Sequence, residues 1–165
     1  MLRKILIILM AVHLIDAPTH ESANIKAKDD AIFFDGASVQ VGIESLDLTS
    51  EWVDREAFYD GYMTEEIEYR KEKYPGSYLA VRYCDNGIIR VYFSADDFDK
   101  AVPISVYGLS WGVSKNDIIN ILGDPLEDIT QTDIQTLLYE DYSKSIKISF
   151  MLNKSGLYAV DIYKI

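Results

Sequence analysis

The sequence predicts an α+β fold built from two tandem units, each a helix packed on an antiparallel meander. The main observation is an internal duplication, because residues 83–93 recur as residues 152–162 when their glycines are aligned. A second set recurs with identical spacing, in which Val39, Val41, Gly42, Asp47 and Leu48 return as Leu109, Trp111, Gly112, Asp117 and Ile118. Repetition of this kind indicates a repeated supersecondary unit. We therefore expect one unit at residues 32–94 and another at residues 104–165.

In the first unit, residues 32–34 and 38–41 flank Asp35 and Gly36, a pair that predicts a two-residue hairpin turn. Residues 45–53 are the expected counterpart of a helix that the second unit shows more clearly. This half is less regular than the second before its last hairpin.

Residues 64–73 fit either the start of a helix or a strand. Thr64 is followed by two glutamates, as at a helix N-terminus, whereas Ile67 and Tyr69 alternate as in a strand. We favour the strand because the repeat aligns this stretch with a strand-like segment of the second unit. Residues 95–103 are then the link between the units.

In the second unit, residues 114–122 predict a helix. Ser114 is placed to cap it, Asp117 completes a capping box, and Gly123 ends it with Pro125 just beyond. Three segments rich in β-branched and aromatic residues follow, at residues 136–142, 146–152 and 157–165. They predict a three-stranded meander. The expected core of this unit is Ile118, Ile121, Leu122, Phe150, Val160 and Ile162.

Each unit ends in a hairpin whose three-residue loop closes with glycine, a pattern that fixes the strand register. In the first hairpin, the predicted pairs are Tyr83 with Ile89, Val81 with Val91 and Leu79 with Phe93. In the second, they are Leu152 with Tyr158, Phe150 with Val160 and Ile148 with Ile162. Within each hairpin these residues share one face, so the other face is left for solvent or a partner.

Composition excludes some classes of partner. The 165-residue chain is 48% hydrophobic, as expected of a globular protein. Its formal net charge of −11 argues against nucleic acid, because lysine and arginine drive binding to phosphates. The single cysteine, Cys84, excludes an intramolecular disulfide, and its strand-like surroundings favour a buried thiol over a reactive one.

Residues 1–27 have the pattern of a signal peptide or leader. Arg3 and Lys4 precede an apolar run at residues 5–15 that is too short to span a bilayer unaided. The cleavage site is poorly defined, so an uncleaved anchor stays open, and a membrane is a partner only in that case. We expect a mature chain that starts near Lys28 and functions in the cell envelope or outside the cell.

The predicted mature chain offers no catalytic constellation. Both histidines, His13 and His20, lie in the leader, so no imidazole remains to activate a nucleophile or bind a metal. The densest carboxylate clusters are Asp96, Asp97 and Asp99, and Glu65, Glu66 and Glu68. Neither has the spacing of a calcium loop, and the glycines form no phosphate-binding motif. We predict a protein that is not an enzyme and uses no cofactor and no metal.

The face of the first hairpin opposite the core carries the candidate binding residues. The register sets Arg82 directly opposite Arg90, and like charges so placed destabilise a sheet. Two explanations stay open: acidic side chains of the same protein, or an incoming anionic group held by both guanidinium groups. The candidate set is Tyr78, Arg82, Arg90 and Tyr92, with Met151 and Tyr163 as the matching patch in the second unit.

The helix region also resembles a known family. Trp111, Gly112, Asp117, Ile118, Leu122, Gly123 and Pro125, followed by Leu138 and Tyr139, fit the pattern G-x(4)-[DE]-[VI]-x(3)-[LF]-G-x-P of BamE-like and beta-lactamase-inhibitor-protein-like (BLIP-like) domains. The resemblance covers residues 104–165 clearly and residues 32–94 faintly, and extends to secreted proteins and lipoproteins of Gram-positive bacteria with two such halves. It implies an envelope assembly module, or an inhibitor that grips a protein across its sheet. The lipobox cysteine of many such proteins is absent here.

The sequence therefore predicts an exported binding or scaffold module that recognises a protein partner through its sheet face. One alternative is a secreted hydrolase that uses carboxylates alone. Another is a module that binds cell-wall glycans through tyrosines and through Trp52 and Trp111, although tryptophans more often belong to a core or its edge.

Overall fold

The computed structural model of the chain describes residue 25 and residues 31–48, 53–59 and 65–165. It is predominantly β, with 51% of the described residues in strands and 9% helical, so the predicted α+β class is wrong. The larger sheet contains β3 (Val53–Tyr59), β4 (Glu65–Arg70), β5 (Ser77–Cys84), β6 (Gly87–Ala95), β8 (Glu127–Gln131), β9 (Ile134–Asp141), β10 (Ile146–Asn153) and β11 (Gly156–Lys164). The smaller sheet contains β1 (Ile32–Phe34), β2 (Ala37–Ser38) and β7 (Ile104–Val106).

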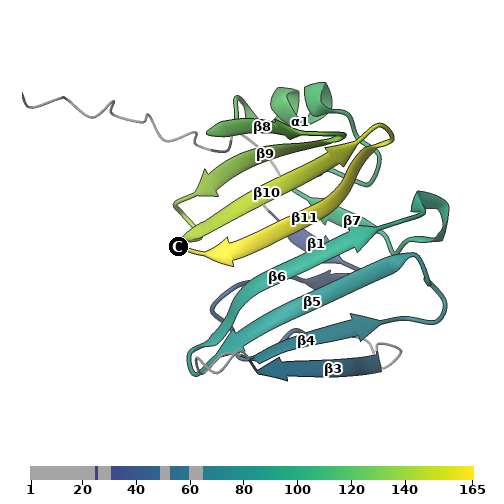
Figure 1. Ribbon diagram of the computed structural model, residues 1–165. Helices are drawn as coiled ribbons and strands as arrows, with labels where there is room; N and C mark the ends of the chain where they lie inside the picture. Colours follow the sequence, from purple (N-terminus) through teal and green to yellow (C-terminus); the bar gives the residue numbers. More distant parts are fainter. Residues whose placement is uncertain (1–24, 26–30, 49–52, 60–64) are drawn as a thin grey trace, which may run out of the picture.

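The larger sheet joins two four-stranded antiparallel meanders edge to edge. Its strand order is β3-β4-β5-β6-β11-β10-β9-β8, so β6 and β11 meet in the middle. The smaller sheet, of order β2-β1-β7, lies behind this middle, and α1 (Lys115–Leu122) lies near β8 (Figure 1). We call the face of the larger sheet turned toward these elements the inner face, and the opposite one the outer face.

The duplication is visible as the same backbone bracket in both halves. The Gly42 amide donates to the Ile88 carbonyl at 2.7 Å, and the Gly112 amide donates to the Leu157 carbonyl at 2.9 Å. The return bonds are Ile88 N to Ile43 O at 2.8 Å and Leu157 N to Val113 O at 3.0 Å. In each half, a glycine-containing segment is thereby fixed to the start of the last strand. We call this pair of hydrogen bonds the backbone bracket, and the repeated element is a meander closed by it.

The predicted helix of the first unit does not form as expected. Residues 45–48 are not helical, and Leu46 and Leu48 pack their side chains against the core from an irregular segment. Residues 49–52 lie outside the described residues, and β3 begins at Val53. The chain is therefore not a pair of helix-plus-meander units, because the described part of the place where the repeat alignment put a helix is irregular and a strand, β3, follows it.

The resemblance to BamE-like and BLIP-like domains is contradicted for the same reason. Local geometry accounts for the residues that carry it: Ser114 and Asp117 form the predicted capping box, and Gly123 ends α1 at φ 92°. Gly112 has φ 76° within the backbone bracket. A motif of this kind specifies a capped helix between two tight turns, and it does not specify the sheet on which that helix packs.

Several local predictions are confirmed. α1 ends and begins as expected, residues 65–70 form a strand, and Asp35 and Gly36 turn the β1–β2 hairpin with φ of 52° and 79°. The meander of the second unit has one strand more than predicted, because β8 was not recognised. Cys84 is half-buried instead of buried.

The predicted registers hold in the middle of both hairpins and shift near both turns. Phe150 pairs with Val160, Ile148 with Ile162, Val81 with Val91 and Leu79 with Phe93. Beside the turns, a register shift pairs Leu152 with Leu157 and Tyr83 with Ile88. The predicted partners Tyr158 and Ile89 were wrong because a β-bulge adds one residue to the second strand of each hairpin.

The core lies between the inner face, the smaller sheet and α1. Leu79, Val91, Phe93, Phe150 and Val160 are fully buried there. Ile118 and Leu122 bury the apolar stripe of α1, whereas the expected core residue Ile121 is 39% exposed. No described element covers the outer face (Figure 1).

Candidate functional site

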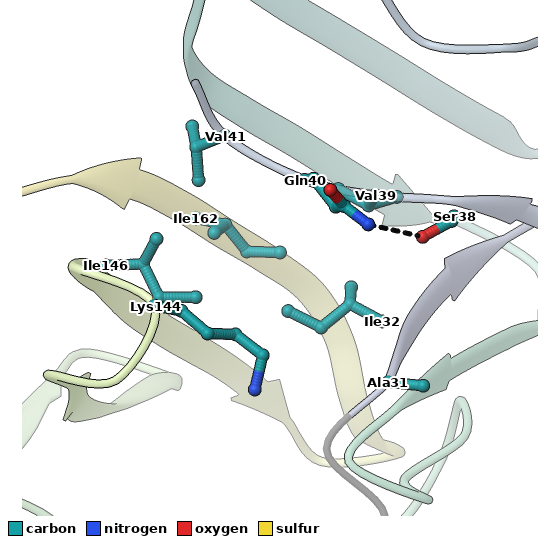
Figure 2. A pocket seen from close by; sticks show the side chains of 9 residues that line it. All are labelled: Ala31, Ile32, Ser38, Val39, Gln40, Val41, Lys144, Ile146 and Ile162. Atoms are coloured by element: carbon teal, nitrogen blue, oxygen red, sulfur yellow. Dashed lines mark hydrogen bonds between the residues drawn. The ribbon is translucent and has the colours of Figure 1, made fainter. Parts of the chain in front are cut away.

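The described part of the structure contains cavities that differ in size and in the residues that line them. A cavity of about 460 Å³ lies between the β1–β2 hairpin and the ends of β10 and β11 (Figure 2). Two broad grooves have volumes of about 680 and 580 Å³, the first lined mostly by residues of α1, β8, β9, β10 and β11 and the second by residues between 35 and 48. A depression of about 210 Å³ lies on the outer face and contains four of the predicted binding residues, Tyr78, Arg82, Arg90 and Tyr92, with Glu66 and Ala80.

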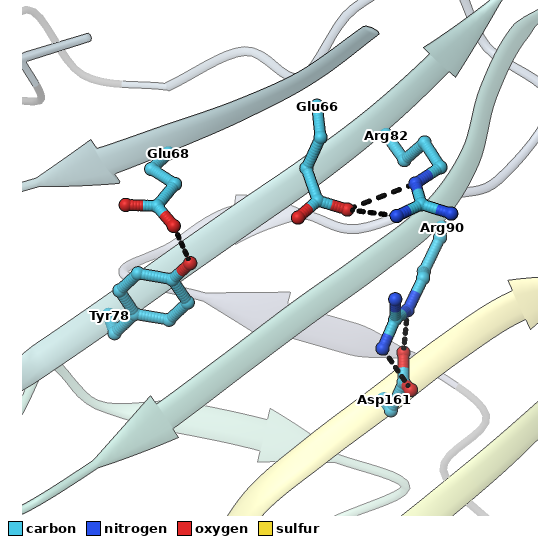
Figure 3. A network of polar contacts seen from close by, with 6 residues as sticks. All are labelled: Glu66, Glu68, Tyr78, Arg82, Arg90 and Asp161. Carbon is cyan, nitrogen blue, oxygen red and sulfur yellow. Dashed lines mark hydrogen bonds and ion pairs between the residues drawn. The ribbon is translucent and has the colours of Figure 1, made fainter. Parts of the chain in front are cut away.

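The two opposed arginines have carboxylate partners within the protein (Figure 3). Arg82 lies directly opposite Arg90, as predicted, and donates through Nε and Nη2 to Oε2 of Glu66 at 3.0 and 2.9 Å. Arg90 forms two parallel bonds of 2.8 Å with the carboxylate of Asp161, which raise the pKa of its guanidinium. The structure thus supplies the acidic side chains of the same protein that the first of the two explanations requires.

Tyr78 is held in the same cluster by three contacts. Its hydroxyl donates to Glu68, its ring meets Tyr92 edge to face with centroids 5.8 Å apart, and the guanidinium of Arg70 lies 5.6 Å from its ring centre. Burial, and then the hydrogen bond to Glu68, raise the pKa of the phenol well above its ordinary value. Tyr78 therefore stays neutral, as a hydrogen-bond donor, at physiological pH.

The structure brings one of the two second-unit candidates to this cluster. Tyr163 pairs with Arg90 across the joint between β11 and β6. Met151 lies on β10, where it pairs with Ala159 of β11 and Thr136 of β9, and it does not line the depression. We name Glu66, Tyr78, Arg82, Arg90 and Tyr92 the outer-face cluster.

Sequence reasoning missed the acidic partners of the tyrosine and the two arginines, which are Glu66, Glu68 and Asp161. Glu66 and Arg82 are neighbours because β4 pairs with β5, and Asp161 reaches Arg90 because β6 pairs with β11. The excess of carboxylates in the chain indicated that such partners exist. Their identity depends on the strand order of the sheet, which a single sequence does not determine.

Charges balance around the cluster although the chain is strongly acidic. The charged side chains that take part in its contacts are Glu66, Glu68 and Asp161, which are negative, and Arg70, Arg82 and Arg90, which are positive. The formal net charge of −11 is therefore carried elsewhere in the chain.

Other candidate groups have structural partners. Trp111 donates its indole N–H to the Val102 carbonyl at 2.8 Å and stacks on Phe98 with ring planes 6° apart. Asp97 caps a short 3₁₀ helix (Phe98–Lys100) and pairs with Lys100. Within the described ranges, no group of three or more acidic, cysteine or histidine side chains is arranged to hold a metal ion. Trp52 lies outside the described residues.

A buried carboxylate closes the turn between β9 and β10. Asp141 accepts hydrogen bonds from the hydroxyls of Tyr107 at 2.7 Å and Ser143 at 2.5 Å, and it pairs with the Lys144 ammonium at 3.0 Å. Burial alone would raise the pKa of this carboxyl. The hydrogen bonds from Ser143, Tyr107 and Lys144 outweigh burial and lower it to about 2.

This depressed pKa predicts a loss of stability in acid. Asp141 contributes its full stabilisation above the unfolded pKa of about 3.9, and the contribution disappears as the pH falls toward 2. We expect about 2 kcal/mol of the unfolding free energy to depend on this group. Unfolding in urea at pH 5 and at pH 2 measures this contribution. Between the two conditions, the unfolding free energy of Asp141→Asn should fall by about 2 kcal/mol less than that of wild type. Equal losses would contradict the assignment.

Comparison with protein-family models, with curated proteins and with solved structures finds no match for the chain. Among the residues that the structure describes, no helix has the length and apolar character needed to cross a bilayer. The predicted leader, at residues 1–27, falls almost entirely outside the described residues.

Proposed function

We propose that the chain is an exported, non-enzymatic binding module that recognises a protein partner in the cell envelope or outside the cell. The outer face of the larger sheet is the proposed binding surface. The observation that carries this proposal is the outer-face cluster, which sets two tyrosines and two arginines on a sheet face that no described element covers. Tyrosine, methionine and arginine are enriched at protein interfaces. The leader-like residues 1–27 support the export part.

The size of the depression favours a protein partner over a free small molecule. Its volume of about 210 Å³ is below the roughly 300–1,000 Å³ of ordinary small-molecule pockets. It lies on an extended sheet surface, where a protein can make further contacts on every side. A depression of this size suits one side chain of a partner, and such anchors carry much of the energy of an interface.

The cluster is held in place before any partner arrives. Arg82 and Arg90 are fixed by Glu66 and Asp161, and Tyr78 is fixed by Glu68. Ordering a long side chain on binding costs about 0.5–1.5 kcal/mol, and side chains that are already ordered avoid most of this cost. Tyr92 packs on Tyr78 in the centre of this arrangement. It is therefore the residue on which the proposal is best tested.

Replacing Tyr92 with alanine is expected to weaken partner binding by about 30-fold, which corresponds to the roughly 2 kcal/mol of a hot-spot residue. The partner is first identified by pull-down from cell-envelope extract, as a protein that wild type retains. Its affinity for both proteins is then measured by titration. The matched control is Tyr142→Ala, at an exposed tyrosine in the β9–β10 turn, which should bind as wild type does.

An unchanged affinity of Tyr92→Ala for every captured protein would contradict the proposal. The double change of Arg82 and Arg90 to alanine is a less sharp test, because it removes the ion-pair partner of Asp161, which is only 8% exposed. A buried carboxylate without its partner destabilises the fold. We therefore expect that variant to unfold more easily as well as to bind more weakly.

A further inference from the structure

The cavity of about 460 Å³ lies on the other side of the sheet from the outer-face cluster. It lies between Ile32 of β1, the segment 39–41 that follows β2, and Ile146 and Ile162 of β10 and β11. In Figure 2 these isoleucines border the open space, with Val41 on one side and Lys144 on the opposite side. The volume falls within the roughly 300–1,000 Å³ of pockets that hold small molecules.

Six of the nine described residues that line this cavity are apolar, and the other three are polar. Ile146 and Ile162 are 2% and 1% exposed, and Ile32 and Val39 are also buried. These side chains belong to the main hydrophobic core, so the cavity is an extension of a packed region. An apolar ligand in such a place gains roughly 25 cal/mol for each Å² of apolar surface removed from water.

One positive charge lies in this apolar wall. The Lys144 side chain lines the cavity and is 30% exposed, and its ammonium also lies 5.1 Å from the ring centre of Tyr107. Its ion-pair partner Asp141 is not a lining residue and is additionally bound by the Tyr107 hydroxyl. The remaining polar side chains of the lining, Ser38 and Gln40, are neutral and bonded to each other at 3.4 Å.

We propose that this cavity binds a small apolar carboxylate, with its hydrocarbon part between the isoleucines and its carboxylate at the Lys144 ammonium. Lys144 is the one charged residue among the described lining residues, and its partner Asp141 lies outside the lining, so a ligand carboxylate would share the ammonium with Asp141. Lysine is a point charge on a flexible stem, so its ammonium can meet a ligand oxygen while it stays near Asp141. A hydrogen bond between charged groups is about twice as strong as one between neutral groups.

The first test compares three probes by titration calorimetry with the full chain. Decanoate has both the apolar chain and the carboxylate, decanol has only the chain, and acetate has only the charge. We expect saturable binding of decanoate at one site, decanol binding at least about tenfold weaker, and no binding of acetate. Decanoate that fails to saturate, or decanol that binds equally well, would overturn the proposal.

The second test uses variants of the cavity itself. Lys144→Gln should weaken decanoate binding about tenfold and leave decanol binding unchanged. Lys115→Gln is the matched control, because Lys115 also forms an ion pair, with Asp128, but lies on α1 outside the cavity. Thermal unfolding of both variants confirms that they are folded at the temperature of the titration.

A third variant does not depend on the Lys144 contacts. Val41 is half-buried in the cavity wall, and Val41→Trp should fill the space and abolish binding of both decanoate and decanol. If Val41→Trp binds decanoate as wild type does, or if Lys144→Gln does so, the ligand is not in this cavity. Because Tyr92 lies on the outer face, Tyr92→Ala should bind decanoate normally, which separates this proposal from the protein-binding function.

Discussion

Replacing Gly156 with alanine is expected to destabilise the protein by about 3 kcal/mol or more. Gly156 has φ 103°, and a Cβ placed there would lie 2.3 Å from the Gly112 carbonyl oxygen and 2.5 Å from its carbonyl carbon. Those atoms cannot retreat, because backbone hydrogen bonds join Gly112 and Val113 to Leu157. The strained φ costs about 1–2 kcal/mol, and the backbone collision adds to it. Urea unfolding measures the loss.

A control at another glycine separates the two causes. Gly108 has a positive φ of 79°, but a Cβ there would meet nothing within 4 Å, so Gly108→Ala should cost only about 1 kcal/mol. Gly87→Ala should resemble Gly156→Ala, because its Cβ would lie 2.4 Å from the Ile43 carbonyl oxygen. If Gly156→Ala and Gly108→Ala cost the same, the backbone bracket is not a rigid feature of the fold.

The features that the sequence predicted correctly are those determined by residues close to one another in the sequence. The α1 capping box needs only Ser114 and Asp117, and the β1–β2 turn needs only Asp35 and Gly36. The predicted hairpin registers were correct in the middle of the strands for the same reason, because loop length and glycine position fix them. The opposition of Arg82 and Arg90 follows from that register, so this part of the candidate site was within reach of the sequence.

The features that the sequence did not predict depend on distant segments. β8 lies at the sheet edge with every residue exposed, so it has no alternation of buried and exposed positions to reveal it. β1 pairs with β7 about seventy residues away, which no local pattern encodes. The site was incomplete for the same reason, because Asp161 meets Arg90 only through the joint between the two meanders.

The cavity was missed because its parts are separated along the chain. Ile32 and Val41 come from the N-terminal hairpin region, whereas Lys144 and Ile162 come from the last two strands. In the sequence, Lys144 is one of several turn lysines. Only the stacking of the smaller sheet on the larger one sets its charge beside an apolar surface.

Replacing Phe150 with alanine is expected to cost about 3 kcal/mol of unfolding free energy. Phe150 is fully buried and pairs with Leu137 and Val160 in the middle of the second meander. Its ring meets Tyr139 edge to face at 5.7 Å, and the Tyr139 hydroxyl donates to the Gly123 carbonyl at the end of α1. Truncation therefore removes apolar burial, an aromatic contact and part of the support of the helix.

The neighbouring residue provides the control for this truncation. Met151 is half-buried on the outer face, so Met151→Ala should cost less than half as much as Phe150→Ala. Urea unfolding with an unchanged slope measures both as differences in stability. Because the two residues are adjacent on β10, strand formation and local propensity affect them alike, and only the face they occupy differs. Equal costs, or a cost below about 1 kcal/mol for Phe150→Ala, would mean that the smaller sheet and α1 do not pack on the inner face as described.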